Sequence, residues 1–168
     1  RMELTYNRAR MDPAWFGYNG ISPFTSMAYE KLANLQSNLG MYGNYINSYT
    51  YYLQTPVYNM MHSLEYIVDN DSEVSVSSDY YTKLMSSGKF TAYENKYNLP
   101  IAFTVDNELS EWFTESANPF SVQSDFVELS TGVSDVFTRM DIDEIRFYNF
   151  DEITTVVSSG DIYFIKSI

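Results

Sequence analysis

Proline at the start and glycine at the end frame two segments of the chain, and this punctuation constrains the fold more than any other feature. Ser22-Pro23 can cap and begin a helix, and Gly40 stands where a C-terminal cap belongs. Asn118-Pro119 and Gly132 frame a second segment in the same way. The predicted helices run from about Pro23 or Ser26 to Leu39, from Thr55-Pro56 through about His62, from Glu108 to Phe113, and from Asn118-Pro119 to Gly132.

Strand patterns surround these helices. Met2 to Arg8 alternates apolar and polar residues, which is typical of a strand with one buried face. Further strands are predicted at Leu64–Val68, Phe90–Glu94, Ile101–Val105, Ile145–Tyr148, Thr154–Val157 and Ile162–Ile165, the last two joined across residues 158–161. The first long helix is expected to bury Ala28, Leu32, Leu35 and Leu39, and the last one Val122, Phe126 and Leu129.

Together these elements predict an α+β fold, with helices packed on a mixed β-sheet and strands at the C-terminus. Its 168 residues suit one domain with an appendage. We expect a main domain over residues 1–132 and a C-terminal β segment over 133–168, which could be the start of a truncated second module. The polar stretch from Asp71 to Ser78 is expected to be a loop.

Charge excludes several classes of function. The net charge is −12, and residues 101–168 hold thirteen acidic against three basic residues. Nucleic-acid binding needs clustered Lys and Arg, so it is not expected. A polyanionic partner would be repelled by the C-terminal half, and the basic start, Arg1, Arg8 and Arg10, or bound cations would have to offset that. With no cysteine, disulfides and thiolate metal sites are excluded.

Hydropathy and aromatic content are the remaining informative features of the composition. No stretch approaches the ~18 apolar residues of a membrane helix, and a chain that begins with Arg1 is interpreted as a piece of a longer protein. Its sixteen tyrosines and eleven phenylalanines suit either carbohydrate and protein interfaces or the core and rim of a β-rich fold.

Several short phrases, in order along the chain, resemble the extracytoplasmic soluble part of the YfhO family of bacterial multi-pass membrane proteins. The resemblance runs from about Arg1 to Gly132. One departure from the family pattern is Glu65, where a basic residue is usual. The phrases are Asn19 to Ser26, Leu39-Gly40, the Thr55-Pro56 helix running into Glu65-Tyr66-Ile67, Tyr93-Glu94-Asn95, Leu99 to Phe103, and Asn118-Pro119-Phe120 with Gln123.

The resemblance implies a role. Family members resemble membrane glycosyltransferases that use lipid-linked sugars on the outer face of the cytoplasmic membrane, and they are implicated in decorating teichoic acids in Gram-positive bacteria. In such enzymes the catalytic carboxylate usually lies in an early loop between membrane helices, so this piece is expected to lack a catalytic residue. Its expected partner is a cell-envelope glycopolymer such as lipoteichoic acid, or a lipid-linked sugar. A secreted carbohydrate- or protein-binding module without an enzymatic parent is the alternative.

Candidate binding residues are aromatic or lie at strand ends. Trp15, Phe16, Tyr18 and Asn19 occupy a loop that could present rings to a sugar, although Asn19-Gly20 also makes a simple turn. Tyr49, Tyr51 and Tyr52 form the second group of candidates. Glu94 and Asn95 fall at a strand end, where they could orient a ligand or satisfy a turn.

Residues typical of catalysis have simpler explanations. His62 is the only histidine and falls at a helix end. The carboxylate pairs Glu108 with Glu111, Asp141 with Asp143 and Glu144, and Asp151 with Glu152 suit a solvated face better than a glycosidase pair, which needs a defined separation. Asp69 to Glu73 lacks the glycine and distal glutamate of a calcium loop. No catalytic residue, metal site or cofactor is therefore predicted, and a soluble glycoside hydrolase is the least favoured hypothesis.

Overall fold

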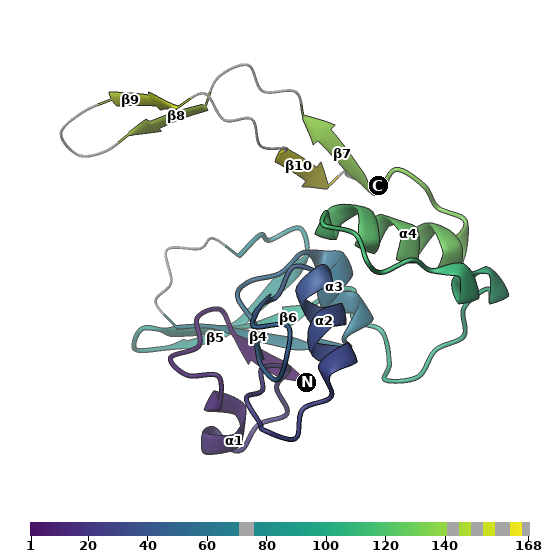
Figure 1. The fold of residues 1–168 in the computed structure, drawn as a ribbon. Helices are drawn as coiled ribbons and strands as arrows, with labels where there is room; N and C mark the ends of the chain where they lie inside the picture. The colour runs from purple at the N-terminus through teal and green to yellow at the C-terminus, as the bar shows by residue number, and fades with distance from the viewer. Residues whose placement is uncertain (71–75, 141–144, 149–152, 157–161, 166–168) are drawn as a thin grey trace.

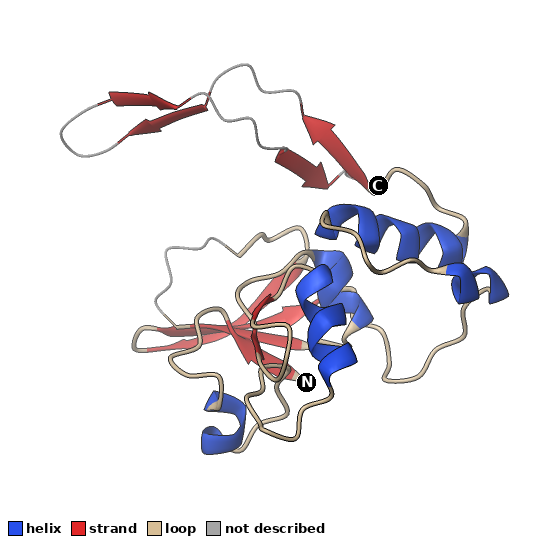
Figure 2. Cartoon of the chain, viewed as in Figure 1, coloured by secondary structure: helices blue, strands red, loops and turns tan. Residues whose placement is uncertain are grey.

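A computed structural model describes residues 1–70, 76–140, 145–148, 153–156 and 162–165, with side chains as far as Thr138. The predicted α+β class is confirmed: a mixed four-stranded sheet lies beside the helices α2 and α3 (Figure 2). The elements are β1 (Met2–Leu4), α1 (Asp12–Phe16), α2 (Glu30–Asn38), β2 (Tyr42–Gly43), β3 (Tyr49–Thr50), α3 (Pro56–Met61), β4 (Tyr66–Asp69), β5 (Tyr81–Ser87), β6 (Phe90–Asn95), the 3-10 helix η1 (Asn107–Glu111), α4 (Pro119–Thr131), β7 (Phe137–Met140), β8 (Ile145–Tyr148), β9 (Ile153–Val156) and β10 (Ile162–Ile165).

The sheet has the strand order β1-β4-β6-β5 (Figure 1). β1 runs parallel to β4, with Met2 opposite Tyr66, and the other two pairings are antiparallel. A parallel pair needs a long crossover, and here residues 5–65 supply it with α1, α2, the β2–β3 hairpin and α3. The pocket described below is built from this crossover.

The core lies between the sheet and the helices. Tyr51, Tyr58, Leu64, Ile67 and Val122 are each fully buried. Tyrosines in this core keep hydrogen-bond partners: the Tyr51 hydroxyl donates to Asn59 Oδ1 at 3.0 Å, and Asn59 Nδ2 donates to the Tyr81 hydroxyl at 2.6 Å. Several tyrosines therefore fill the core, as one of the two interpretations of the composition expected.

Helix ends follow the predicted chemistry in α3 and α4. The Thr55 side chain accepts from the Tyr58 amide at 3.1 Å, and the Asn118 side chain accepts from the Phe120 amide at 3.0 Å. Gly132 ends α4 with φ 74°, a left-handed conformation that glycine adopts without steric cost.

The predicted start of α2 is wrong. The helix begins at Glu30 with Tyr29 as its N-cap residue, and no side chain caps it. The backbone of residues 23–25 instead pairs with the β2–β3 hairpin: the Tyr49 amide donates to the Pro23 carbonyl and the Thr25 amide to the Asn47 carbonyl, each at 3.3 Å. The buried residues within the helix are Ala33, Gln36 and Ser37, and Leu32 is 41% exposed. Leu39, the C-cap residue, is buried as predicted.

Two strand predictions also need correction, and one strand of the four-stranded sheet was not predicted. Residues 101–105, predicted as a strand, form an exposed loop. β5 was not predicted; it is mostly exposed and is held by its pairing with β6 rather than by an apolar pattern of its own. The C-terminal pairing also differs, because β8 pairs with β9 and β7 with β10, apart from the four-stranded sheet (Figure 1).

Two further results bear on function. In the part of the chain that the structure describes, no helix has the length and apolar character needed to cross a bilayer. The division into residues 1–132 and 133–168 stays a prediction. Most of the predicted loop from Asp71 to Ser78 lies outside the described residues, as do the acidic residues Asp141, Asp143, Glu144, Asp151 and Glu152.

Candidate functional site: a tyrosine and arginine pocket

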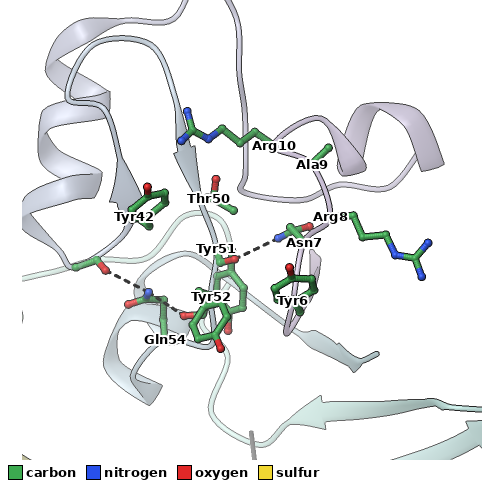
Figure 3. Close-up of a pocket in the computed structure, with 11 residues that line it drawn as sticks. Tyr6, Asn7, Arg8, Ala9, Arg10, Tyr42, Thr50, Tyr51, Tyr52 and Gln54 are labelled. Carbon is green, nitrogen blue, oxygen red and sulfur yellow. Dashed lines mark hydrogen bonds between the residues drawn. The ribbon is translucent and has the colours of Figure 1, made fainter. Parts of the chain in front are cut away.

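A pocket of about 530 Å³ opens between the segment that follows β1 and the β2–β3 hairpin (Figure 3). Three stretches of chain meet there, residues 6–10, 40–42 and 50–54, and all three belong to the long crossover between β1 and β4. The lining residues are Tyr6, Asn7, Arg8, Ala9, Arg10, Gly40, Tyr42, Thr50, Tyr51, Tyr52 and Gln54.

Three exposed tyrosine rings give the pocket its aromatic character. Tyr6 and Tyr52 form an isolated antiparallel bridge, and their rings meet edge to face with centroids 6.4 Å apart. Each is about half exposed, at 52% and 51%. Tyr42 projects from the other side of the pocket and is 71% exposed (Figure 3). Such rings offer flat apolar faces with a hydroxyl at the edge, a combination that suits sugars.

Two arginines add positive charge. Arg10 Nη1 donates to Ser48 Oγ at 2.5 Å, and its guanidinium carbon lies 5.8 Å from the centroid of the Tyr42 ring. Arg8 is exposed, and its side chain extends away from Arg10 and from the rings of Tyr42 and Tyr52 (Figure 3). The residues that line the pocket include no Asp or Glu. Although the protein has a net charge of −12, the lining of this pocket therefore favours an anion.

A buried hydrogen-bond network holds the chain segments around this pocket in place. The fully buried Glu3 carboxylate accepts from the amides of Ile21 and Ser22, the latter at 2.7 Å. Ser22 Oγ accepts from the Tyr51 amide at 2.8 Å and from Asn7 Nδ2 at 3.2 Å. Asn7 Nδ2 also lies 3.3 Å from the Tyr51 carbonyl (Figure 3). Ser22 is thus a cross-link between β1 and the hairpin, and its predicted role as a helix cap is wrong.

The loop residues predicted to bind a ligand are placed on and beside α1. Trp15 and Phe16 are 70% and 67% exposed, and Asn19 is exposed. Tyr18 is partly buried, and its hydroxyl donates to Asn7 Oδ1 at 3.3 Å. Burial, with the nearby carboxylates of Glu3 and Asp12, raises the pKa of Tyr18 well above its usual range. None of the four lines the pocket.

The second group of predicted binding residues, Tyr49, Tyr51 and Tyr52, is divided between the core and the pocket. Tyr49 is 7% exposed and Tyr51 is fully buried, so their rings belong to the core, although Tyr51 also forms part of the pocket wall. Burial raises the pKa of Tyr51 far above its usual range, and the nearby Tyr81 adds to this. Tyr52, which follows Tyr51 in the chain, turns its ring to the pocket (Figure 3).

The third predicted group is separate from the pocket. Glu94 is exposed on β6. Asn95 is buried; its Nδ2 donates to the Leu64 carbonyl at 2.9 Å and its Oδ1 accepts from the Tyr97 amide at 3.0 Å. Asn95 therefore joins the end of β6 to the start of β4.

Sequence reasoning did not select Tyr6, Tyr42 or Gln54 as site residues, and it noted Arg8 and Arg10 only as charge. A signal was present for one of them: Tyr6 continues the two-residue alternation of the first strand beyond its hydrogen-bonded end, on the side of Met2 and Leu4. Residues 8–10 form bends and a turn, so this alternation does not predict where Arg8 and Arg10 point.

Nothing in the described part of the chain resembles a catalytic centre. Glu108 and Glu111 are exposed, and no group of three or more metal-binding side chains is found among the described residues. His62 is used structurally: its ring stacks on Tyr58 with centroids 4.0 Å apart, Nδ1 lies 2.9 Å from the Tyr58 carbonyl, and Nε2 lies 2.8 Å from Gln36 Nε2. Burial lowers the pKa of this histidine. The geometry of the pocket suits binding.

Comparison with known proteins gives one match. The model of a family described as "Bacterial membrane protein YfhO" matches residues 1–163, which is nearly the whole chain. No curated protein and no solved structure matches the chain.

Proposed function

The chain belongs to the YfhO family of bacterial membrane proteins, and from this membership we propose that it is an extracytoplasmic domain of a multi-pass membrane glycosyltransferase. The parent enzyme transfers sugar from a lipid carrier to lipoteichoic acid or a related cell-envelope polymer of Gram-positive bacteria. This domain binds or positions the acceptor polymer and does not itself catalyse the transfer.

The pocket is the observation that carries the proposal. A teichoic acid is a chain of phosphodiesters and sugars or polyols, so a site for it needs cations and flat apolar surfaces. Arg8 and Arg10 supply the cations, and guanidinium groups bind phosphate with paired hydrogen bonds. The exposed rings of Tyr6, Tyr42 and Tyr52 supply surfaces on which a sugar can stack.

The charge distribution supports an anionic ligand at this pocket. Residues 101–168 are strongly acidic and would repel a polyanion. The pocket lining has two arginines and no carboxylate. A polyanion is therefore drawn to this part of the surface, and the attraction weakens with added salt.

Binding of polyglycerol phosphate tests the proposal. We expect measurable binding by calorimetry, no binding of an uncharged glucan, and weaker binding as salt increases. Tyr52→Ala and the double change Arg8→Gln with Arg10→Gln are each expected to weaken binding at least about tenfold, because each removes a contact made directly to the ligand. Lys83→Gln is the control, since it removes one exposed positive charge on β5.

Equal binding by wild type and both pocket variants would place the polymer elsewhere. Equal losses in the pocket variants and in Lys83→Gln would indicate unspecific charge attraction. Either result rejects the pocket as the acceptor site.

A secreted binding module without an enzymatic parent is the second candidate, and the aromatic pocket would serve it equally well. The two candidates differ in the reading frame that encodes this chain. Several apolar spans of about 20 residues, with an acidic residue in an early outer loop, support the membrane enzyme. A frame with only a signal peptide supports the secreted module.

A further inference from the structure

Large apolar side chains without intramolecular cover gather on two neighbouring loops. The loop before α2 exposes Phe24, Met27 and Tyr29 at 47%, 92% and 66%. The turn between β2 and β3 exposes Tyr45 and Ile46 at 56% and 61%. The Phe24–Ser48 bridge and a hydrogen bond between Thr25 and Asn47 join the two loops, so the segments that carry these exposed side chains lie side by side.

Helix α1 adds two exposed rings, Trp15 and Phe16. Arg10, which leads into α1, is hydrogen-bonded to Ser48 of the hairpin, and Figure 1 draws α1 and the loop before α2 at the same end of the molecule. We call the combined set the aromatic loop surface. It consists of Trp15, Phe16, Phe24, Met27, Tyr29, Tyr45 and Ile46.

The tip of the hairpin is held in a costly conformation. Tyr45 has φ 61°, a left-handed backbone that a bulky side chain rarely adopts. The Asn44 side chain fixes the turn, because its Oδ1 accepts from the amides of Ile46, Asn47 and Ser48 at 3.0–3.1 Å. The chain therefore uses a rigid turn to present Tyr45 and Ile46 to the outside. Retained backbone strain of this kind is common at functional sites.

The surface is also free of charge in a strongly acidic protein. Residues 13–29 and 41–48 contain no Asp, Glu, Lys or Arg, although the chain as a whole carries −12. The buried Asp12 directly precedes the first stretch, after Arg8 and Arg10, and the exposed Glu30 and Lys31 follow it. A neutral, aromatic face lets an acidic domain approach an anionic membrane with less repulsion than its acidic parts would meet, and the nearby Arg8 and Arg10 add attraction.

We propose that the aromatic loop surface rests on the anionic outer leaflet of the cell membrane. Trp15 and the tyrosines match the depth of the headgroups, where amphipathic rings are preferred. Met27, Ile46 and the phenylalanines reach the edge of the acyl chains, and the arginines pair with lipid phosphate. The match to a membrane protein family is consistent with this. The apolar side chains of this contact lie outside the pocket, whereas Arg8 and Arg10 also line the pocket.

Co-flotation of the full chain with vesicles tests the proposal. We expect binding to vesicles of phosphatidylglycerol and phosphatidylcholine, and much weaker binding to pure phosphatidylcholine. Met27→Ser with Ile46→Ser is expected to lower the partition coefficient about tenfold, because both apolar side chains leave the acyl region. Met85→Ser with Ile101→Ser is the matched control, with side chains 62% and 82% exposed outside the surface, and it should bind as wild type does.

The two tryptophans supply a second readout. Trp112→Phe leaves only Trp15, and Trp15→Phe leaves only Trp112, whose Nε1 donates to the Val122 carbonyl at 2.9 Å. Brominated phosphatidylcholine in the anionic vesicles should quench Trp15 and not Trp112. Circular dichroism verifies that each variant is folded.

Three results would overturn the proposal: no binding to anionic vesicles, equal quenching of the two tryptophans, or equal losses in both double variants. Light scattering tests a second copy as the occupant. A dimer that Met27→Ser with Ile46→Ser abolishes would replace the membrane by a self-interface. Polymer binding is measured without vesicles, so failure of the acceptor site and failure of the membrane surface are distinguishable.

Discussion

At the scale of single residues, close packing around position 20 explains why this residue is a glycine. A Cβ atom at this position would lie 2.5 Å from Pro13 Cγ and 2.9 Å from Glu3 Oε1. Real Cβ atoms do not approach other atoms so closely, and Glu3 cannot move without losing the amides of Ile21 and Ser22. The loop phrase that begins at Asn19 is thus explained by a buried carboxylate and the amides around it.

Gly20→Ala is expected to lower the free energy of unfolding by about 1–3 kcal/mol through overpacking. Urea unfolding followed by circular dichroism measures it. The control is Gly88→Asn, at a turn with φ 57° and no atom within 4 Å of the added Cβ, where Asn tolerates the left-handed backbone and the change should stay within about 0.5 kcal/mol. Equal losses in the two variants would refute the packing argument.

His62 is expected to make stability depend on pH. Its pKa is lowered, chiefly by burial, so between about pH 6.5 and the lower folded-state pKa the unfolded chain binds more protons than the native one. The free energy of unfolding therefore falls as the pH falls through this window. In the neutral ring, the hydrogen bonds assign Nδ1–H as donor to the Tyr58 carbonyl and Nε2 as acceptor from the Gln36 amide.

Urea unfolding between pH 5 and 8 tests this, with His62→Gln as the comparison. Carboxylates contribute to both proteins and cancel in the difference. Wild type should lose stability relative to the variant as the pH falls below about 6.5, with a constant difference above pH 7.5. A constant difference over the whole range would show that His62 titrates alike in both states.

At the scale of elements, one side chain joins three of the sequence phrases. Gln123 of α4 is 1% exposed. Its Nε2 donates to the Leu39 carbonyl at 2.8 Å and its Oε1 accepts from the Thr55 hydroxyl. The end of α2, the start of α3 and the first turns of α4 therefore meet at one amide. Gly40, with φ 101°, lies against Pro119 at the same junction.

Gln123→Met is expected to lower the free energy of unfolding by about 2–3 kcal/mol. The substitution keeps the length of the side chain but leaves the buried Leu39 carbonyl without its donor and the Thr55 hydroxyl without its acceptor. Glu128→Met, at an exposed position of the same helix, is the control for helix propensity. Thermal unfolding of both variants measures the change in stability. A loss of stability in Glu128→Met as large as in Gln123→Met would contradict the prediction.

At the scale of the whole molecule, charge and aromatic surface are separated along the chain. The uncharged loops and the two pocket arginines come from the first third, and the acidic excess comes from residues 101–168. The proposed acceptor site and the proposed membrane surface both belong to the crossover between β1 and β4. The domain boundary predicted at residue 132 stays a prediction. Just after it, Val136 is buried, and the ring of Phe137 contacts that of Phe120 in α4 with centroids 5.2 Å apart.

Local chemistry was readable from the sequence alone. The α+β class, the caps at Thr55 and Asn118 and the glycine stop at Gly132 depend on residues adjacent in the chain, and they were predicted. The family was also recognised from its phrases. The structure shows that several of these phrases consist of residues that pack or form hydrogen bonds inside the fold. For this reason they indicated the fold and did not reveal a binding site.

Only the tertiary structure decided which residues form the pocket and which tyrosines are buried. Tyr51 and Tyr52 are neighbours in sequence, yet one is in the core and the other faces the pocket. The start of α2 and the existence of β5 were likewise set by distant partners, the hairpin at Asn47 and the strand β6. Backbone groups take the partner that the whole fold brings near, and periodicity along the chain carries no information about that partner.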